Sequence, residues 1–78
     1  MNFPLDATLL NQRLAAYLKP LRHEANITRQ DLAGQMGVSY SVISHFERNL
    51  QGLDVGEFVV ICHILNQNPV AVLQAVLE

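Results

Sequence analysis

The stretch of sequence that decides the fold runs from Thr28 to Asn49 and reads TRQDLAGQMGVSYSVISHFERN. A small residue, Ala33, stands four positions before Gly37, and the branched residue Ile43 follows that glycine by six positions. Two short helices that cross at a steep angle need a small side chain at the crossing and a glycine to reverse the chain between them. The spacing therefore predicts two helices joined by a tight turn.

Residues that favour helix ends delimit these two helices. Thr28 offers a capping hydroxyl, and Asp31 places a carboxylate in the first turn, where the helix dipole favours negative charge. Gly37 is expected to take the left-handed conformation that ends the first helix, and Ser39 is expected to cap the second, which continues to Arg48.

The segment before this unit predicts one long amphipathic helix. It begins near Asp6 or Thr8, either of which can cap it. Its apolar residues recur at helical spacing: Leu10, Leu14, Tyr17, Leu18 and Leu21. Pro20 removes one backbone hydrogen bond, so we expect a kink or a break near Lys19.

The segment after the unit predicts two more helices. Asp54 and Glu57 have the spacing of a capping box, and an almost entirely apolar helix follows over residues 54–66. Asn68 precedes Pro69, which is typical of a helix start, and the last helix is expected over residues 69–78. No segment alternates as a strand does, so the fold class is all-α with five helices.

Length and composition indicate one domain of a cytoplasmic protein. Seventy-eight residues form a single domain, and half of them are apolar, more than one small core needs. The one cysteine, Cys62, lies in an apolar run and is expected to be buried and reduced. The chain shows no membrane-spanning run and no secretion signal, so we expect no membrane partner.

Charge is distributed unevenly along the chain. The net charge is −2, but residues 1–50 carry all five basic and four acidic residues, whereas residues 51–78 carry three acidic and no basic residues. Any surface that binds an anion therefore lies in the first two thirds of the chain.

The sequence resembles the helix-turn-helix family of the lambda repressor and Cro type, also called the xenobiotic-response-element family. The resemblance covers roughly residues 14–65. Its matching segments are Leu21-Arg22, Asp31-Leu32-Ala33, Met36-Gly37-Val38-Ser39, Ile43-Ser44 and Phe46-Glu47-Arg48. It implies a five-helix, lambda-repressor-like domain with its core over residues 14–66. The Glu47-Arg48-Asn49 stretch looks most like the controller proteins of restriction-modification systems.

The resemblance implies a transcriptional regulator that binds double-stranded DNA. Its recognition helix, residues 39–48, would enter the major groove, and helical spacing places Tyr40, Ser41, Ser44 and His45 on the exposed face. Arg29 stands where the family usually has a glutamine that contacts phosphate. The expected DNA-binding residues are Arg29, Gln30, Ser39, Tyr40, Ser41, Ser44, His45 and Asn49.

Arg22 and Glu47 match positions that form an ion pair in some family members. If the pair is buried, it orients the recognition helix, and losing one partner costs about 3–5 kcal/mol. If it is solvated, it contributes under about 1 kcal/mol. The sequence leaves both possibilities open.

The apolar surplus near the C-terminus predicts a homodimer. Helix 69–78 has apolar residues on two faces, which a five-helix domain cannot hide completely. Related regulators place two recognition helices about 34 Å apart and bind a pseudo-palindromic operator. The expected dimer interface consists of Val70, Leu73, Val76 and Leu77.

The sequence gives little support for catalysis or for the binding of a metal ion or a cofactor. His23, His45 and His63 lack metal-ligand spacing, and no acid completes a catalytic set with Ser41 and His45. We expect no enzyme activity, cofactor or small-molecule ligand. The alternative to a DNA-binding regulator is a protein-interaction module on the same scaffold, such as an antitoxin, an adaptor or an anti-repressor, with weak or no DNA binding.

Overall fold

Five helices make up the computed structural model, which describes residues 6–78, and no strand is found among these residues. In chain order they are α1 (Ala7–Glu24), α2 (Arg29–Met36), α3 (Tyr40–Glu47), α4 (Val55–Ile64) and α5 (Pro69–Leu77). The predicted all-α, five-helix architecture is confirmed.

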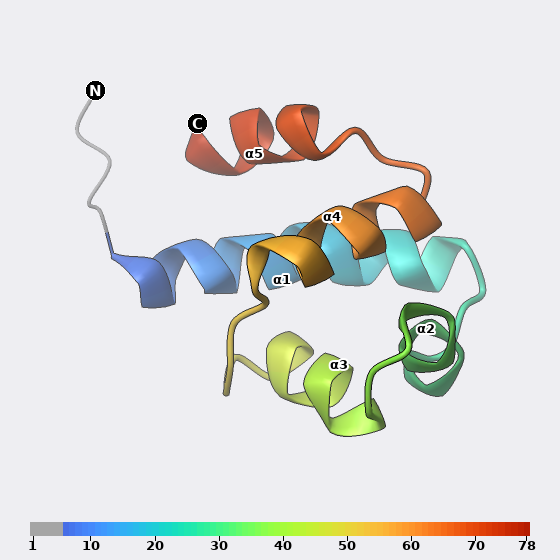
Figure 1. The fold of residues 1–78 in the computed structure, drawn as a ribbon. Helices are drawn as coiled ribbons and strands as arrows, with labels where there is room; N and C mark the ends of the chain where they lie inside the picture. Colours follow the sequence, from blue (N-terminus) through green and yellow to red (C-terminus); the bar gives the residue numbers. More distant parts are fainter. Residues whose placement is uncertain (1–5) are drawn as a thin grey trace.

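The long helix α1 packs against α3 and α5. Figure 1 shows it running through the middle of the domain, with α2 and α3 on one side and α5 on the opposite side. Helix α2 packs against α3 and α4, and α4 packs against α5. The helix-turn-helix therefore lies at one side of the domain, away from the C-terminal helix.

Side-chain caps begin four of the five helices, at residues that the sequence predicts. Asp6 accepts from the amide of Thr8 at 2.9 Å, which selects Asp6 over Thr8 as the cap of α1. The remaining three caps are Thr28, Asn68, and Asp54 with its capping-box partner Glu57.

The predicted hydroxyl cap of α3 is wrong. Ser39 has the extended backbone of an N-cap residue, but its side chain makes no cap hydrogen bond. Its Oγ lies 3.0 Å from the Oγ of Ser41, and the two hydroxyls share a hydrogen bond. Because these hydroxyls satisfy each other, the first amides of α3 receive no side-chain cap from Ser39.

Four helices end in the same way, with a residue in the left-handed region. These residues are Asn26, Gly37, Asn49 and Asn66, with φ between 57° and 71°. After each of them, the next amide closes a six-residue turn, as Leu50 does on the His45 carbonyl at 2.8 Å. The sequence predicts this stop for Gly37; at the other three ends asparagine takes the same conformation.

Pro20 does not break α1, which is continuous from Ala7 to Glu24. Both Pro20 and Ala16, whose carbonyl loses its helical partner, lie on the exposed side of the helix. Water can reach that carbonyl, and the packed face of α1 holds the helix together.

The core lies where α1, α2, α3 and α4 converge, and α5 closes one side of it. Its fully buried side chains are Phe46, Leu18, Leu32, Ile43, Ile61, Val72 and Cys62. Burial raises the pKa of the Cys62 thiol, which keeps it protonated. Val76 is only 5 % exposed, so its predicted place in a dimer interface is wrong: it belongs to the core of its own chain.

Within residues 6–78, no single helix is long and apolar enough to cross a membrane. Helices α4 and α5 reach that length and hydropathy only when taken together, and the chain bends by 108° between them.

Two glycines of the helix-turn-helix give a matched test of the turn. Gly37 needs its positive φ of 71°, whereas Gly34 lies inside α2; a Cβ at either position meets nothing within 4 Å. Gly37→Ala should lower the free energy of unfolding by about 1–2 kcal/mol, because an L side chain is strained there. Gly34→Ala should raise it by about 0.4–1 kcal/mol. Denaturant unfolding of both variants measures the difference.

A Gly37→Asn variant serves as the control, since asparagine ends three other helices of this chain. It should cost less than Gly37→Ala. Equal stability of the Gly37→Ala variant and the wild type would contradict a strained left-handed turn.

Candidate nucleic-acid interface

The exposed face of α3 is presented at the edge of the domain. Ile43 and Phe46 anchor the helix in the core, both at most 1 % exposed. Tyr40 is 51 % exposed, Ser41 is exposed and His45 is half-buried. The start of α3 therefore offers a phenol, a hydroxyl and an imidazole to an approaching surface.

Ser44 is not part of that surface, although helical spacing predicts it there. The residue is 7 % exposed, on the face of α3 that it shares with Glu47. Helix α3 packs against α1 as well as α2, so two of its faces are covered rather than one. The predicted exposure of Ser44 is therefore wrong.

Arg48 continues the exposed ridge of α3, three residues after His45 and seven after Ser41. It is exposed and forms the C-cap of the helix. Arg48 was not among the predicted DNA-binding residues; its i, i+7 relation to Ser41 was the signal available.

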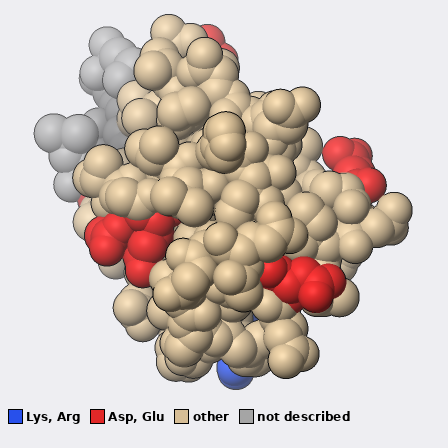
Figure 2. Space-filling model, turned by 45° about the vertical axis from the view of Figure 1, so that its right-hand side comes forward, with Lys and Arg blue, Asp and Glu red and all other residues tan. Residues whose placement is uncertain are grey.

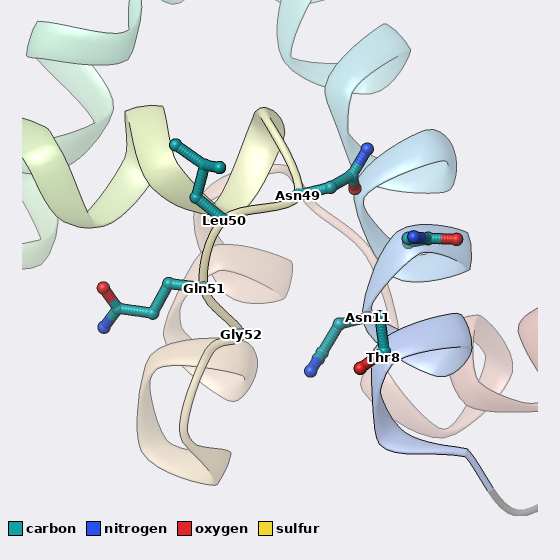
Figure 3. A pocket seen from close by; sticks show the side chains of 7 residues that line it. Thr8, Asn11, Asn49, Leu50, Gln51 and Gly52 are labelled. Carbon is teal, nitrogen blue, oxygen red and sulfur yellow. The ribbon is translucent and has the colours of Figure 1, made fainter.

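Asn49 ends α3 instead of extending its exposed face. Its φ is 63°, and Figure 3 shows its side chain directed toward α1. There it lines a hollow of about 180 Å³ between the start of α1 and the α3–α4 loop. Gly52 lies so close to α1 in this hollow that a Cβ would collide with the Asn11 side chain.

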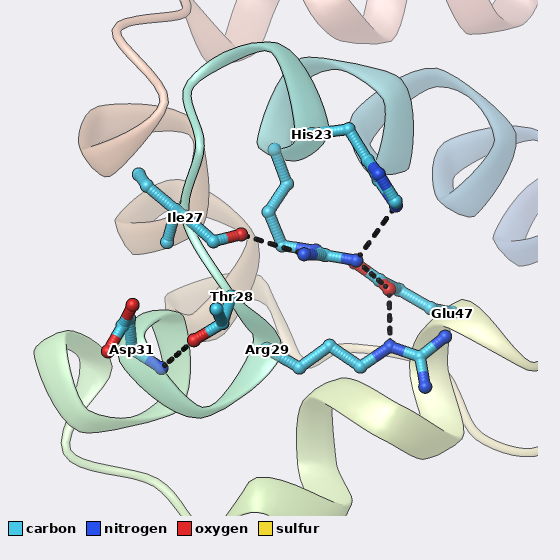
Figure 4. A network of polar contacts seen from close by, with 7 residues as sticks. His23, Ile27, Thr28, Arg29, Asp31 and Glu47 are labelled. Carbon is cyan, nitrogen blue, oxygen red and sulfur yellow. Dashed lines mark hydrogen bonds and ion pairs between the residues drawn. The ribbon is translucent and has the colours of Figure 1, made fainter.

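A buried carboxylate ties α3 to both α1 and α2. Arg22 donates to Glu47 through two nitrogens, Nε to Oε2 at 2.6 Å and Nη2 to Oε1 at 2.9 Å. Arg29 donates from Nε to Oε1 at 2.8 Å (Figure 4). The side chain of Glu47 is 2 % exposed and that of Arg22 is 7 % exposed, so the buried alternative for this pair is the one observed.

The guanidinium of Arg22 also has partners within the chain besides the Glu47 carboxylate. Its Nη1 donates to the Ile27 carbonyl at 2.7 Å, and its Nη2 lies 3.2 Å from Nε2 of His23. Because a guanidinium can only donate, Nε2 of His23 accepts in this arrangement. Arg22 therefore positions α3 and is not available to an external anion.

Burial alone raises the pKa of Glu47, since it penalises the charged form. The hydrogen bonds from Arg22 and Arg29, with their positive charges, outweigh burial and hold the pKa of Glu47 below its usual value. The pKa of Arg29 is raised in turn, first by its hydrogen bond to Glu47 and then by the neighbouring Tyr40 hydroxyl. The cluster is thus ionised at neutral pH and carries a net positive charge.

A basic hollow opens beside the start of α3. It measures about 500 Å³, and no acidic residue lines it. The lining residues are Lys19, Arg22, His23, Thr28, Arg29, Gln30 and Tyr40. The sequence predicts Arg29, Gln30 and Tyr40 at the interface. Lys19 and His23 were not predicted there; α1 brings them to the hollow because they lie four residues apart on one helical face.

Another face of the molecule is poor in charge. Figure 2 shows acidic side chains standing apart among uncharged ones, with blue visible only at the lower edge. Exposed apolar residues occur on both C-terminal helices, including Val55, Val59 and Val60 on α4 and Val70 and Leu73 on α5. Among residues 6–78, no group of three His, Cys, Asp or Glu side chains is placed to hold a metal ion.

We expect substitutions of Glu47 and of Arg29 in this ion cluster to lower the free energy of unfolding by different amounts. Glu47→Gln leaves the buried Arg22 without a counter-charge and should lower the free energy of unfolding by about 3 kcal/mol at pH 7. Arg29→Gln removes a side chain that is 27 % exposed and should cost under about 1 kcal/mol. Urea unfolding at pH 7 measures both values.

Unfolding measurements at low pH provide the control for this prediction. Because the pKa of Glu47 is lower in the folded chain, its stabilisation is complete above the unfolded pKa of about 4.3 and is lost as the pH falls through the folded pKa. Wild type should therefore lose more stability between pH 6 and pH 3 than Glu47→Gln. Equal losses would show that the carboxylate is not selectively stabilised in the fold.

Comparisons with known proteins agree with this geometry. No curated protein sequence matches the chain. The crystal structure of the clp gene regulator ClgR from Corynebacterium glutamicum has a TM-score of 0.78 and 27 % identity, over 86 % of this chain and 71 % of that one. A tyrosine-to-alanine mutant of the restriction-modification controller protein C.Esp1396I has a TM-score of 0.76 and 25 % identity, over 86 % of this chain and 87 % of that one.

A family model described as a helix-turn-helix domain matches residues 13–75, most of the chain. This match covers all of α2, the turn and α3, together with the elements that support them. The chain therefore belongs to the helix-turn-helix domain family, with the lambda-repressor-like fold of DNA-binding transcriptional regulators.

Proposed function

We propose that this protein is a sequence-specific transcriptional regulator that binds a pseudo-palindromic operator as a homodimer. The observation that carries the proposal is the position of an acid-free basic hollow beside the exposed start of α3. A helix that enters the major groove needs phosphate contacts at its flank and hydrogen-bonding side chains at its tip.

Base contacts come from the first turns of α3. Tyr40 and Ser41 are exposed at the helix start, and His45 lies one turn further on. Their hydroxyl and imidazole groups can hydrogen-bond base edges, and the Tyr40 ring can pack on a thymine methyl. Without a bidentate arginine or glutamine at the tip, each contact discriminates modestly between bases.

Phosphate contacts come from the basic hollow. Arg29 uses Nε for Glu47, and in Figure 4 its two terminal nitrogens point away from the carboxylate. These nitrogens, with Lys19 and the exposed Gln30, can bind one backbone phosphate at the start of α2. The Glu47 contact fixes the guanidinium in advance, which reduces the entropy lost on binding.

Dimerisation uses the apolar surface of α4 and α5. Val70 is 62 % exposed and Leu73 is 37 % exposed, and α4 adds Val55, Val59 and Val60 at 41–80 %. Leu77 is half-buried at the edge of this surface, and Val76 is excluded from it. Helices α5 and α3 lie on opposite sides of α1 (Figure 1), so a partner on α5 does not cover the recognition helix.

The shortage of cations favours the competing function, a protein-interaction module. Arg22 is taken up by Glu47, and Arg13 donates to the Val76 carbonyl at 3.2 Å. Lys19, Arg29 and Arg48 are left to meet phosphates. A dimer that uses all three per chain reaches a salt slope no steeper than about −5.

Selection of duplexes from a random library, followed by gel shifts at several salt concentrations, tests the regulator. We expect an enriched site with two half-sites about 34 Å apart. Ser41→Ala should lower affinity for the enriched site about fivefold at most and leave non-specific affinity unchanged, since a single hydroxyl contact is worth no more than the low end, about 1 kcal/mol, of what a bidentate pair contributes.

Ser44→Ala is the matched control, because Ser44 is buried on the other side of α3. It should leave the base preference unchanged. Absence of any enriched duplex and of any shift at low salt would reject the regulator in favour of the interaction module.

Sedimentation velocity tests the dimer surface. Leu73→Glu and Val59→Glu place a charge on the proposed interface and should convert the dimer into a monomer. Leu50→Glu is the control, because Leu50 is 63 % exposed on the α3–α4 loop and belongs to neither α4 nor α5. Dimers that persist in both interface variants would place the interface elsewhere.

A further inference from the structure

We propose that His23 takes up a proton when DNA occupies the basic hollow, so that affinity for DNA rises as the pH falls from 8 to 6. This histidine lies on α1, outside the helix-turn-helix, and lines the hollow with Lys19 and Arg29. The inference rests on the proposed function and concerns how that function responds to pH.

The contact between His23 and Arg22 indicates which form of the imidazole the free protein holds. Nη2 of Arg22 lies 3.2 Å from Nε2 of His23 (Figure 4). Because a guanidinium can only donate, Nε2 carries a lone pair, and the ring is neutral with its hydrogen on Nδ1. A second proton, on Nε2, would remove this hydrogen bond and set two donors against each other.

Positive groups surround His23 in the hollow. Lys19 lies one turn earlier on α1, Arg22 directly precedes His23, and Arg29 comes from the start of α2. Tyr40, at the start of α3, adds an uncharged phenol. These neighbours oppose a further positive charge on the imidazole as long as no anion is present.

The acidic groups near His23 do not change when DNA binds. Glu47 is already held by Arg22 and Arg29, and these three side chains together carry one net positive charge. Glu24 follows His23 at the exposed end of α1 and does not line the hollow. These charges, like the partial negative charge at the end of α1, are present with and without DNA. The new charge is that of the phosphate.

A backbone phosphate in the hollow reverses the balance at His23. Protonation lets Nε2 donate to a phosphate oxygen and adds a positive charge to that contact. His23 is exposed, so its ring can turn from Arg22 to the phosphate without disturbing the core. Arg22 keeps its other three hydrogen bonds, to Glu47 and to the Ile27 carbonyl. Each of the two ligands, the phosphate and the proton, therefore favours binding of the other.

Histidine is the group in the hollow that changes charge near neutral pH. Lysine and arginine stay protonated above pH 8, and the pKa of Glu47 is held below its usual value, so its carboxylate stays ionised at pH 6. A change in DNA binding between pH 8 and pH 6 that arises in the hollow is therefore assigned to His23.

Isothermal titration calorimetry tests the proton uptake, with the duplex enriched by wild-type protein as the probe. Titrations at pH 7 in two buffers of different ionisation enthalpy count the protons taken up on binding. The wild-type dimer should take up about 0.5–1 proton more than the His23→Gln dimer, because each of its two histidines is partly protonated before binding. Glutamine keeps an acceptor for Arg22 but does not titrate.

Gel shifts at pH 6 and pH 8, at one salt concentration, give a second measure. Affinity should rise about tenfold more in the wild type than in His23→Gln, since two charge-assisted contacts are gained per dimer. The salt slope of the wild type should also be steeper at pH 6 than at pH 8, by up to about 0.9 per chain. His63→Gln is the matched control, because His63 lies on α4 and does not line the hollow; it should keep the full proton uptake.

Two results would overturn the inference. The first is equal proton uptake and equal pH dependence in the wild type and in His23→Gln. The second is loss of the whole pH dependence in His45→Gln, which would assign the proton to the exposed face of α3 instead of the hollow. In both, the wild type still binds DNA, so the proposed function survives; absence of wild-type binding at pH 6, 7 and 8 would reject both.

Discussion

The carboxylate of Glu47 is the group on which the geometry of the helix-turn-helix depends. It lies at the end of α3 and accepts hydrogen bonds from Arg22 on α1 and Arg29 on α2. Burying these charges costs solvation that their attraction only partly returns, so the cluster adds little net stability compared with apolar packing. Its effect is geometric: α3 cannot shift against α1 or α2 without leaving a buried charge unpaired.

This arrangement leaves few cations for the surface. Arg22 is enclosed, Arg29 divides its guanidinium between Glu47 and solvent, and Arg13 reaches the end of α5. Affinity for a polyanion is set largely by the number of phosphates that cations neutralise. A single copy with so few free cations binds DNA weakly, which makes a second copy on the same duplex the physical route to useful affinity.

Residues close together in the sequence are sufficient to predict the helices of this chain. Which faces of a helix become buried depends on other helices, which are distant in the sequence. Capping residues such as Thr28 and Asp54, and the glycine at position 37, act through adjacent backbone and are visible in the sequence. Ser44 and Val76 were misplaced because a periodic pattern shows that a helix has an apolar face but not how many neighbours cover it. The role of Asn49 as a helix stop was not predicted for a different reason: asparagine serves equally as a polar surface residue and as a left-handed helix stop.

The two halves of the chain separate two physical tasks. The side of α1 that carries α2 and α3 holds the charged cluster and the basic hollow, whereas the side that carries α5 is closed by apolar contacts through Val72 and Val76 (Figure 1). Because α1 lies between them as one continuous helix, α5 and α3 are both held in position by packing against the same helix. In the proposed homodimer, a partner bound at α5 would therefore set the distance and the direction of a second α3 through α1 itself, so the spacing of two recognition helices would be a property of the scaffold rather than of a flexible linker.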